Sequence, residues 1–313
     1  MDVKDAYKKI AALRTNLGKV IRGKADIIDL AITALLAKGH LLIEDVPGVG
    51  KTTLAHSLAR SINCSFQRIQ FTSDLLPSDV IGTTVYNQAG HSFEFRQGPI
   101  FANIVLADEI NRATPKTQSA LLEAMNDRQV SVDKTTWPLP APFMLLATQN
   151  PLEFSGTFPL PESQLDRFMM CIKIGYPDEE YERIVIRSSG ANDMGSLVPV
   201  LTTVDVEGLQ RLASQVRMDE DLVTYILSIA NATRKHKAIR LGVSPRATMA
   251  MYRAAQAKAL VSGRDYCIPD DIKGLSPHLF AHRIITAERG LEAGVDAGLS
   301  LTEEILGTLR API

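Results

Sequence analysis

Residues 40–53 of this chain place an apolar run before a glycine-rich turn and the sequence Gly-Lys-Thr-Thr. Leu41, Leu42 and Ile43 predict a short buried strand, and apolar residues at helical spacing after Lys51 predict a helix. The glycines of such a turn let backbone N–H groups approach an anion, and the N-terminus of the helix adds partial positive charge. A strand, a glycine loop and a helix in this order predict a site for the phosphates of a nucleotide.

The residues predicted to bind the phosphates are Pro47, Gly48, Val49, Gly50, Lys51, Thr52 and Thr53. Lys51 would reach the β- and γ-phosphates, and the Thr52 hydroxyl would bind Mg²⁺. The strict motif begins with glycine, whereas this chain has Asp45 at that position. A glycine loop that only turns a strand into a helix is the alternative.

A second apolar stretch ends in two carboxylates. Residues 103–107 predict a buried strand, which Asp108 and Glu109 follow. Asp108 is placed to hold the Mg²⁺ shell, and Glu109 is placed to orient and deprotonate a water molecule for attack on the γ-phosphate. Acidic residues that only cap the next helix are the alternative. With the glycine loop, the pair predicts ATP hydrolysis with ATP and Mg²⁺ bound.

Length, composition and charge favour a globular protein over a nucleic-acid-binding, membrane or disulfide-rich one. A chain of 313 residues has room for two domains, and 22% charged residues is ordinary for a globular protein. The formal net charge of −1 gives no reason to expect nucleic acid as a partner. No apolar run is long enough to span a bilayer, so we expect no membrane insertion and a cytoplasmic protein. The three cysteines, far apart, argue against disulfides and zinc.

Two segments flank the predicted strands. Residues 2–37 show helical periodicity with a break around Gly23, and such an arm either covers the nucleotide base or only packs on the sheet. Residues 83–86 and 92–96 surround a turn and suggest a hairpin-like excursion. An excursion from a rigid sheet is a candidate contact surface; a plain surface loop is the alternative.

Several long motifs resemble the MoxR family of AAA+ ATPases. They read Glu-Asp-Val-Pro-Gly-Val-Gly-Lys-Thr at 44–52, Gln-Phe-Thr-Ser-Asp-Leu-Leu-Pro-Ser-Asp at 70–79, Asp-Glu-Ile-Asn-Arg-Ala at 108–113 and Lys-Thr-Gln-Ser-Ala-Leu-Leu-Glu-Ala-Met at 116–125. The first motif is similar to family sequences that also lack the initial glycine. The resemblance covers nearly the whole chain.

The resemblance implies an α/β fold, with a P-loop NTPase core of the AAA+ type that has a parallel five-stranded sheet and is followed by an all-α lid domain. Residues 1–178 would form the nucleotide-binding core with its N-terminal helical arm, residues 179–204 a connecting helix and linker, and residues 205–313 the helical lid. A β-hairpin that starts at Gln129 would face the central pore of a ring. Trp137 near its end could as well be an ordinary core residue.

Residues 143–148 predict a further buried strand, and two residues that come after it match catalytic positions of the family. Asn150 matches sensor 1, where an amide can bond the attacking water or the γ-phosphate; an Asn-Pro turn is the alternative. Arg167 matches an arginine that reaches the ATP of the neighbouring subunit and stabilises transition-state charge. An arginine that pairs with Glu162 or Asp166, or caps its helix, is the alternative.

Arg246 matches the sensor-2 arginine of the family, which couples the lid to the nucleotide. Ser244 is a good N-cap and Pro245 a good first-turn residue, so Arg246 lies in the first turn of a helix. The helix dipole disfavours a cation there, unless the cation faces a phosphate. A surface arginine is the alternative. Arg112 could also face a subunit interface.

His278 and His282 are four residues apart and could share one face of a helix. Leu279 stands where a zinc protease would have glutamate. We therefore expect both histidines to face solvent or an interface.

The resemblance implies a homo-oligomer, a hexameric ring, that hydrolyses ATP to remodel or activate client proteins, often with a partner that carries a von Willebrand factor A domain. A magnesium-chelatase-type ATPase subunit and a DNA-dependent ATPase are alternatives, and the net charge argues against DNA. A nucleotide-binding switch without turnover is another alternative, against which Glu109 and Arg167 argue.

Overall fold

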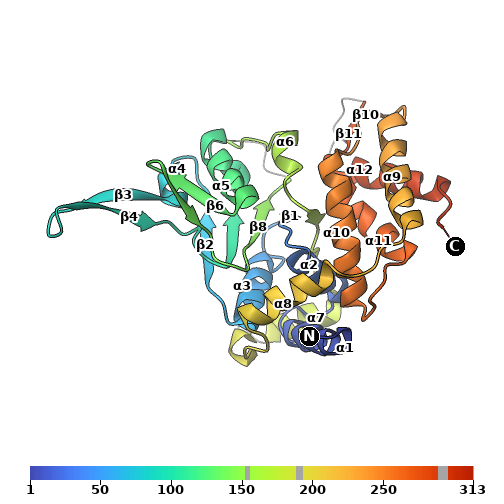
Figure 1. The fold of residues 1–313 in the computed structure, drawn as a ribbon, viewed down its shortest axis with the longest axis horizontal. Helices are drawn as coiled ribbons and strands as arrows, with labels where there is room; N and C mark the ends of the chain where they lie inside the picture. The colour runs from blue at the N-terminus through green and yellow to red at the C-terminus, as the bar shows by residue number, and fades with distance from the viewer. Residues whose placement is uncertain (152–155, 188–192, 288–294, 313) are drawn as a thin grey trace.

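Five parallel strands form the central sheet of the structure, a computed structural model that describes residues 1–151, 156–187, 193–287 and 295–312. The strand order is β2 (Phe66–Gln70), β5 (Ile104–Asp108), β8 (Met144–Gln149), β1 (Leu41–Glu44) and β9 (Met170–Ile172). Every pairing in this sheet is parallel, which confirms the predicted core. Figure 1 shows the sheet between two β-hairpins and the helical lid.

The strand register gathers polar residues at one edge of the sheet. Gln70 of β2 pairs with Asp108 of β5, and Glu44 of β1 pairs with Gln149 of β8. Because parallel strands end at the same edge, the segments that follow β1, β5 and β8 meet there. This is the edge at which the sequence predicts the nucleotide.

Alternate residues of each strand face two different cores. Leu41 and Ile43 belong to the core that includes the N-terminal arm and the lid, whereas Leu42 belongs to the core under α5 (Pro115–Asp127). The first core also contains buried residues of α1 (Val3–Gly18), α2 (Ala25–Leu36) and α3 (Lys51–Ile62). The arm thus packs on the sheet. Burial of an aliphatic side chain of this size stabilises the fold by about 1.5–3 kcal/mol.

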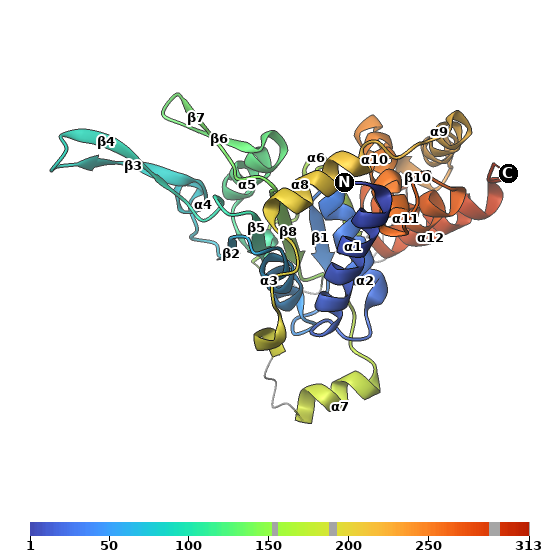
Figure 2. The ribbon, with the colours of Figure 1, turned by 60° about the horizontal axis from the view of Figure 1, so that its bottom comes forward.

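Two hairpins project from the core on the side away from the lid (Figures 1 and 2). The first joins β3 (Gly82–Asn87) and β4 (Ser92–Gln97), after the short helix α4 (Pro77–Ile81). The second joins β6 (Gln129–Val132) and β7 (Thr135–Pro138). The half-buried Trp137 stacks on Phe95 of the first hairpin, with ring centroids 5.0 Å apart. Trp137 therefore joins the hairpins rather than filling an ordinary core.

The C-terminal part is helical, as predicted, with one short sheet added. After the core come α7 (Glu179–Arg187), η2 (Asp193–Ser196) and α8 (Thr203–Ala213). The remaining elements are α9 (Glu220–Lys235), β10 (Ile239–Leu241), α10 (Pro245–Val261), α11 (Pro269–Phe280), η3 (Ala281–Arg283), β11 (Ile285–Thr286) and α12 (Val295–Thr308). β10 and β11 pair antiparallel, which the helical periodicity did not predict. The predicted end of α7 at Ser188 and residues 188–192 of the predicted connector lie outside the described residues. Among the helices that the structure describes, none has both the length and the apolar character to cross a membrane.

Candidate functional site

The loop between β1 and α3 has the backbone conformation of an anion cradle. Gly48 and Gly50 have φ of 87° and 95°, in the left-handed region that favours glycine. A β-carbon on Gly48 would meet nothing within 4 Å, so the backbone conformation and not lack of space requires glycine there. Gly50 is the N-cap of α3 and supplies no capping side chain, so no such group competes for the first N–H groups of the helix.

Asp45, in place of the first glycine, ties this loop to the exit of β9. Its Oδ1 accepts a hydrogen bond from the Val46 N–H at 2.8 Å, and its Oδ2 accepts one from the Gly175 N–H at 2.7 Å. The side chain is buried. The departure from the strict motif therefore has a structural role: the carboxylate holds the loop against the segment that leaves the sheet.

Lys51 lies close to the predicted acids. Its ammonium donates a hydrogen bond to the carbonyl of Asp45 at 2.7 Å. Burial lowers the pKa of Lys51, and the carboxylates of Asp108, Asp45 and Glu109 act in the opposite direction. The ammonium is thus within electrostatic reach of both carboxylates at the end of β5. Thr52 and Thr53 follow it in the first turn of α3, and both are half-buried.

Asp108 is held from both sides by neighbouring strands. Its Oδ1 accepts a hydrogen bond from the hydroxyl of Thr148 on β8 at 2.6 Å. Its Oδ2 accepts two bonds from the guanidinium of Arg68 on β2, at 2.5 Å and 3.1 Å. The guanidinium of Arg68 thus pairs with the same carboxylate that is predicted to hold the Mg²⁺ shell.

Glu109 has a left-handed backbone, with φ of 57° and ψ of 49°. This conformation is uncommon for a residue with a β-carbon. The N–H of Glu109 donates to the Thr148 hydroxyl at 2.8 Å, and its carboxylate accepts from Gln70 at 2.8 Å and lies 3.3 Å from Arg112. Its side chain makes no capping bond to η1 (Ile110–Arg112), the helix that follows. The capping alternative is therefore wrong for Glu109.

Asn150 lies at the same edge, directly after β8, and is buried. The N–H of Asp45 donates to the carbonyl of Gln149 at 3.2 Å, which joins the start of the glycine loop to the end of β8. Asn150 is thereby placed next to the loop in the fold.

Arg167 and Arg246 lie near the contact between core and lid. Arg167 follows α6 (Glu162–Leu165), and its Nη1 donates to the carbonyl of Leu122 in α5 at 2.7 Å. Among the described residues it forms no ion pair with Glu162 or Asp166, which pair with Arg240 and Arg283, so the ion-pair alternative is wrong. Arg246 is exposed in the first turn of α10, where the Ser244 side chain accepts a bond from the Ala247 N–H, as an N-cap does.

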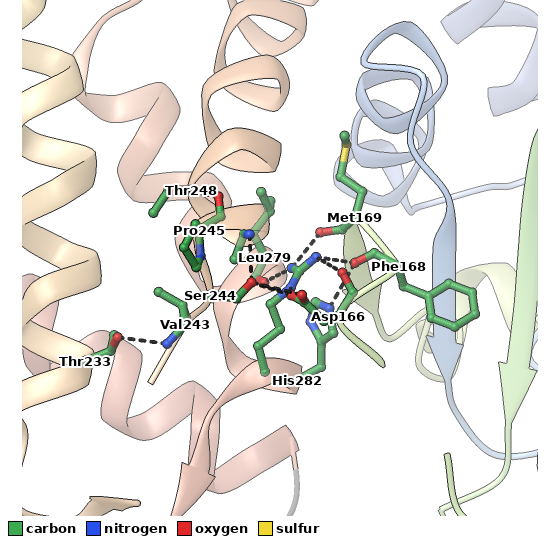
Figure 3. A network of polar contacts seen from close by, with 12 residues as sticks. Asp166, Phe168, Met169, Thr233, Val243, Ser244, Pro245, Thr248, Leu279 and His282 are labelled. Carbon is green, nitrogen blue, oxygen red and sulfur yellow. Dashed lines mark hydrogen bonds and ion pairs between the residues drawn. The ribbon is translucent and has the colours of Figure 1, made fainter. Parts of the chain in front are cut away.

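Of the two predicted environments for the histidines, solvent or an interface, solvent is wrong for His282. It is buried, and its Nε2 lies 3.3 Å from the carbonyl of Phe168, beside β9 (Figure 3). Burial lowers the pKa of His282 well below its usual range. His278 is half-buried and bonds the backbone of Cys171. Both histidines lie where the lid meets the core: His278 is in α11, which packs on β9, and His282 is in η3, which directly follows α11.

Three residues that contact the two acids were not among the predicted site residues: Arg68, Gln70 and Thr148. Arg68 and Gln70 are polar residues at alternate positions of β2, on the strand next to β5. That alternation was visible in the sequence, but only the strand order shows that β2 borders the acidic pair.

Comparison with known proteins agrees with this geometry. Residues 40–170 match the ATPase family associated with various cellular activities (AAA), and residues 231–300 match the AAA lid domain. The chain is 47% identical to the uncharacterized protein YeaC of Bacillus subtilis, over 99% of this chain and 97% of that one. It is 43% identical to the chaperone MoxR1 of Mycobacterium tuberculosis, over 94% of this chain and 80% of that protein.

A solved structure extends the likeness to the fold. The crystal structure of a candidate ATPase from Cytophaga hutchinsonii superposes with a TM-score of 0.89 and 38% sequence identity, over 99% of this chain and 97% of that chain. The match includes both the sheet and the lid. The chain therefore belongs to the MoxR family of AAA+ ATPases, enzymes that bind and hydrolyse ATP.

Proposed function

We propose that this chain assembles into a hexameric ring in the cytoplasm and uses ATP hydrolysis to remodel or activate client proteins. The observation that carries the proposal is the arrangement of the glycine loop and the two acids around the end of β8. Thr148 bonds Asp108 and Glu109, and the carbonyl of the next residue, Gln149, accepts the Asp45 N–H at the start of the loop that leads to Lys51. A cation for the phosphates and a pair of carboxylates at one sheet edge are what hydrolysis of a nucleoside triphosphate requires.

We assign the binding of the phosphates and of Mg²⁺ to different residues around the glycine loop. The loop residues from Pro47 to Thr53 would surround the phosphates, with Lys51 on the β- and γ-phosphates. Thr52 and Asp108 have the hydroxyl and carboxylate oxygens that Mg²⁺ prefers, and the ion would neutralise phosphate charge when bound.

Glu109 would take a proton from the attacking water. Its contacts with Gln70 and Arg112 fix the position of the carboxylate. Asn150 would bond the water or the γ-phosphate. Arg246 would contact the ATP of its own subunit, and Arg167 the ATP of the next, where such an arginine is worth about 10³–10⁵ in kcat.

The client role is supported by the relative that carries the name chaperone. A partner with a von Willebrand factor A domain fits the family resemblance, and the two projecting hairpins offer a contact surface: Tyr86 and Phe93 are exposed large apolar residues on the first of them.

A Glu109→Gln variant tests this function directly. We expect it to bind ATP, form rings in sedimentation velocity, and retain a client when recovered from a lysate with ATP, but not with ADP. Lys51→Ala, which should not hold the triphosphate, is the matched control. A variant that stays monomeric with ATP at all concentrations would contradict the ring.

A further inference from the structure

The carboxylate of Asp166 joins three segments: the one that contains Arg167, the first turn of α10, and η3 of the lid. Asp166 directly precedes Arg167, and both of its carboxylate oxygens lie 2.9 Å from the hydroxyl of Ser244, the N-cap of α10 (Figure 3). The same carboxylate accepts a bond from Nε of Arg283, in η3 of the lid, at 2.9 Å. We call Asp166, Ser244 and Arg283 the Asp166 cluster.

Arg283 is the fixed part of this cluster. Its side chain is 3% exposed and donates to the carbonyls of Met169, Phe168 and Asp166, at 3.1, 2.5 and 3.1 Å, and to that of Leu279. If this buried guanidinium moved away, both it and its carbonyl acceptors would lose their hydrogen-bond partners, which is costly in a buried place. Arg283 therefore keeps η3 attached to the segment that leads into β9.

The bond from Ser244 is the part that can change. One hydroxyl has a single proton, although two carboxylate oxygens are in reach. The hydroxyl also accepts the Ala247 N–H at 3.2 Å, so it belongs to the helix turn that carries Arg246. Burial lowers the pKa of the Arg283 guanidinium, and the positive charge of Arg246 acts in the same direction. A shift of Arg246 toward or away from a phosphate would move Ser244 with it.

We propose that the bond between Ser244 and Asp166 transmits the nucleotide state of a subunit from Arg246 to Arg167. Asp166 and Ser244 act as positioning residues. When Arg246 binds a phosphate of ATP, the first turn of α10 moves, and Ser244 moves Asp166 with it. Arg167, the next residue, then changes its contact with the carbonyl of Leu122. The inference rests on the proposed roles of the two arginines. It adds a physical connection between them within one subunit.

Substitutions at Ser244 separate this role from helix capping. Ser244→Asp keeps a strong N-cap but places a second carboxylate against Asp166, so the bond is replaced by repulsion. Ser244→Thr keeps both the cap and the donor hydroxyl. Asp166→Asn is less informative, because it would leave Arg283 buried without its charge partner.

Hydrogen exchange gives the readout. The amides of residues 164–168 are all hydrogen-bonded within the α6 segment or to the residues beside it, so their exchange reports its motion. We compare wild type, Ser244→Asp and Ser244→Thr with and without the magnesium complex of adenylyl imidodiphosphate. All samples are held in one oligomeric state, checked by sedimentation velocity. Protection of residues 45–53 shows in each sample that nucleotide is bound.

We expect nucleotide to change exchange in residues 164–168 several-fold in wild type and Ser244→Thr, and less than about twofold in Ser244→Asp. An equal change in Ser244→Asp, or no change in wild type while residues 45–53 are protected, would overturn the proposal. If residues 45–53 gain no protection in any protein, the proposed nucleotide site itself is wrong. The two failures are therefore distinguishable.

Discussion

The guanidinium of Arg68 holds the carboxylate of Asp108 through two nitrogens, at 2.5 Å and 3.1 Å. Arg68 also donates to the amide oxygen of Gln70 at 2.9 Å, and Gln70 in turn donates to Glu109. Strand β2 thus supplies a polar partner to each acid at the end of β5. A cation that binds at Asp108 has to share this carboxylate with Arg68 or displace it.

Replacing Arg68 should lower the Mg²⁺ requirement. In Arg68→Gln the carboxylate of Asp108 no longer pairs with a guanidinium, so Mg²⁺ binds without that competitor. A partly exposed ion pair is worth about 1 kcal/mol, which corresponds to about a fivefold lower Mg²⁺ concentration at half-saturation. Fluorescent ADP titrated with Mg²⁺ measures it. Arg183→Gln, which removes an exposed pair on α7, is the control. A higher requirement in Arg68→Gln would mean that Arg68 helps to hold the ion.

Glu109→Gln should separate binding from hydrolysis. The amide keeps the size of the side chain but cannot take a proton, so kcat should fall by about 10²–10⁴-fold. The dissociation constant for ATP should change little, because Lys51 and the glycine loop are intact. Steady-state hydrolysis and nucleotide titration give the two values. Glu94→Gln on the first hairpin is the control, and turnover at the wild-type rate in Glu109→Gln would disprove the general-base role.

Arg167→Ala should abolish most hydrolysis while each subunit still binds nucleotide. Mixing it with Lys51→Ala subunits should restore part of the turnover, at interfaces where an intact Arg167 meets an intact glycine loop. Phosphate release across a series of mixing ratios measures the recovery. If mixed rings form and no ratio recovers activity, Arg167 does not act between subunits.

Asp45→Ala should destabilise the fold. The change leaves the N–H groups of Val46 and Gly175 without their carboxylate acceptor in a buried place, at a cost of about 1–3 kcal/mol. Urea unfolding measures it. Asp45→Asn keeps an acceptor oxygen and should lose less. Asp45→Gly restores the strict motif and should lose as much stability as Asp45→Ala. If Asp45→Gly is more stable than wild type, the hydrogen bonds of the Asp45 carboxylate do not stabilise the fold.

The buried histidines should make stability fall in mild acid. Burial lowers the pKa of His40 from 6.5 to about 3, and its ring accepts the Leu145 N–H and contacts the Met125 carbonyl. The folded pKa is below the unfolded one, so the unfolded chain binds the proton first. The stability that neutral His40 provides is complete above pH 6.5 and is lost as the pH falls from there toward 3.

This loss can be measured against a variant. His40 should contribute a slope of about 1.4 kcal/mol per pH unit below pH 6.5, and His282 should add to it for the same reason. Urea unfolding between pH 6 and 5 should show a slope that is smaller by this amount in His40→Asn. An unchanged slope would show that His40 is already protonated in the folded protein.

The sequence by itself determined the buried strands next to the site, the glycine loop and the acidic pair. Those features are local: an apolar run forms a buried strand wherever it stands, and Gly48 and Gly50 need no distant partner to take a left-handed backbone. The roles of Asn150, Arg167 and Arg246 and the domain limits at 178 and 204 came from the family resemblance, and they stay predictions.

Only the tertiary structure decided which polar side chains meet. Arg68 reaches Asp108, Asp45 reaches Gly175, and Asp166 reaches Ser244 across wide gaps in the chain. Helical spacing predicted that His278 and His282 could share one face, but it did not predict that the segment of β9 packs against this face. The physical reason is that a hydrogen bond depends on distance and direction in space, and the strand order and lid packing that set these are properties of the whole fold.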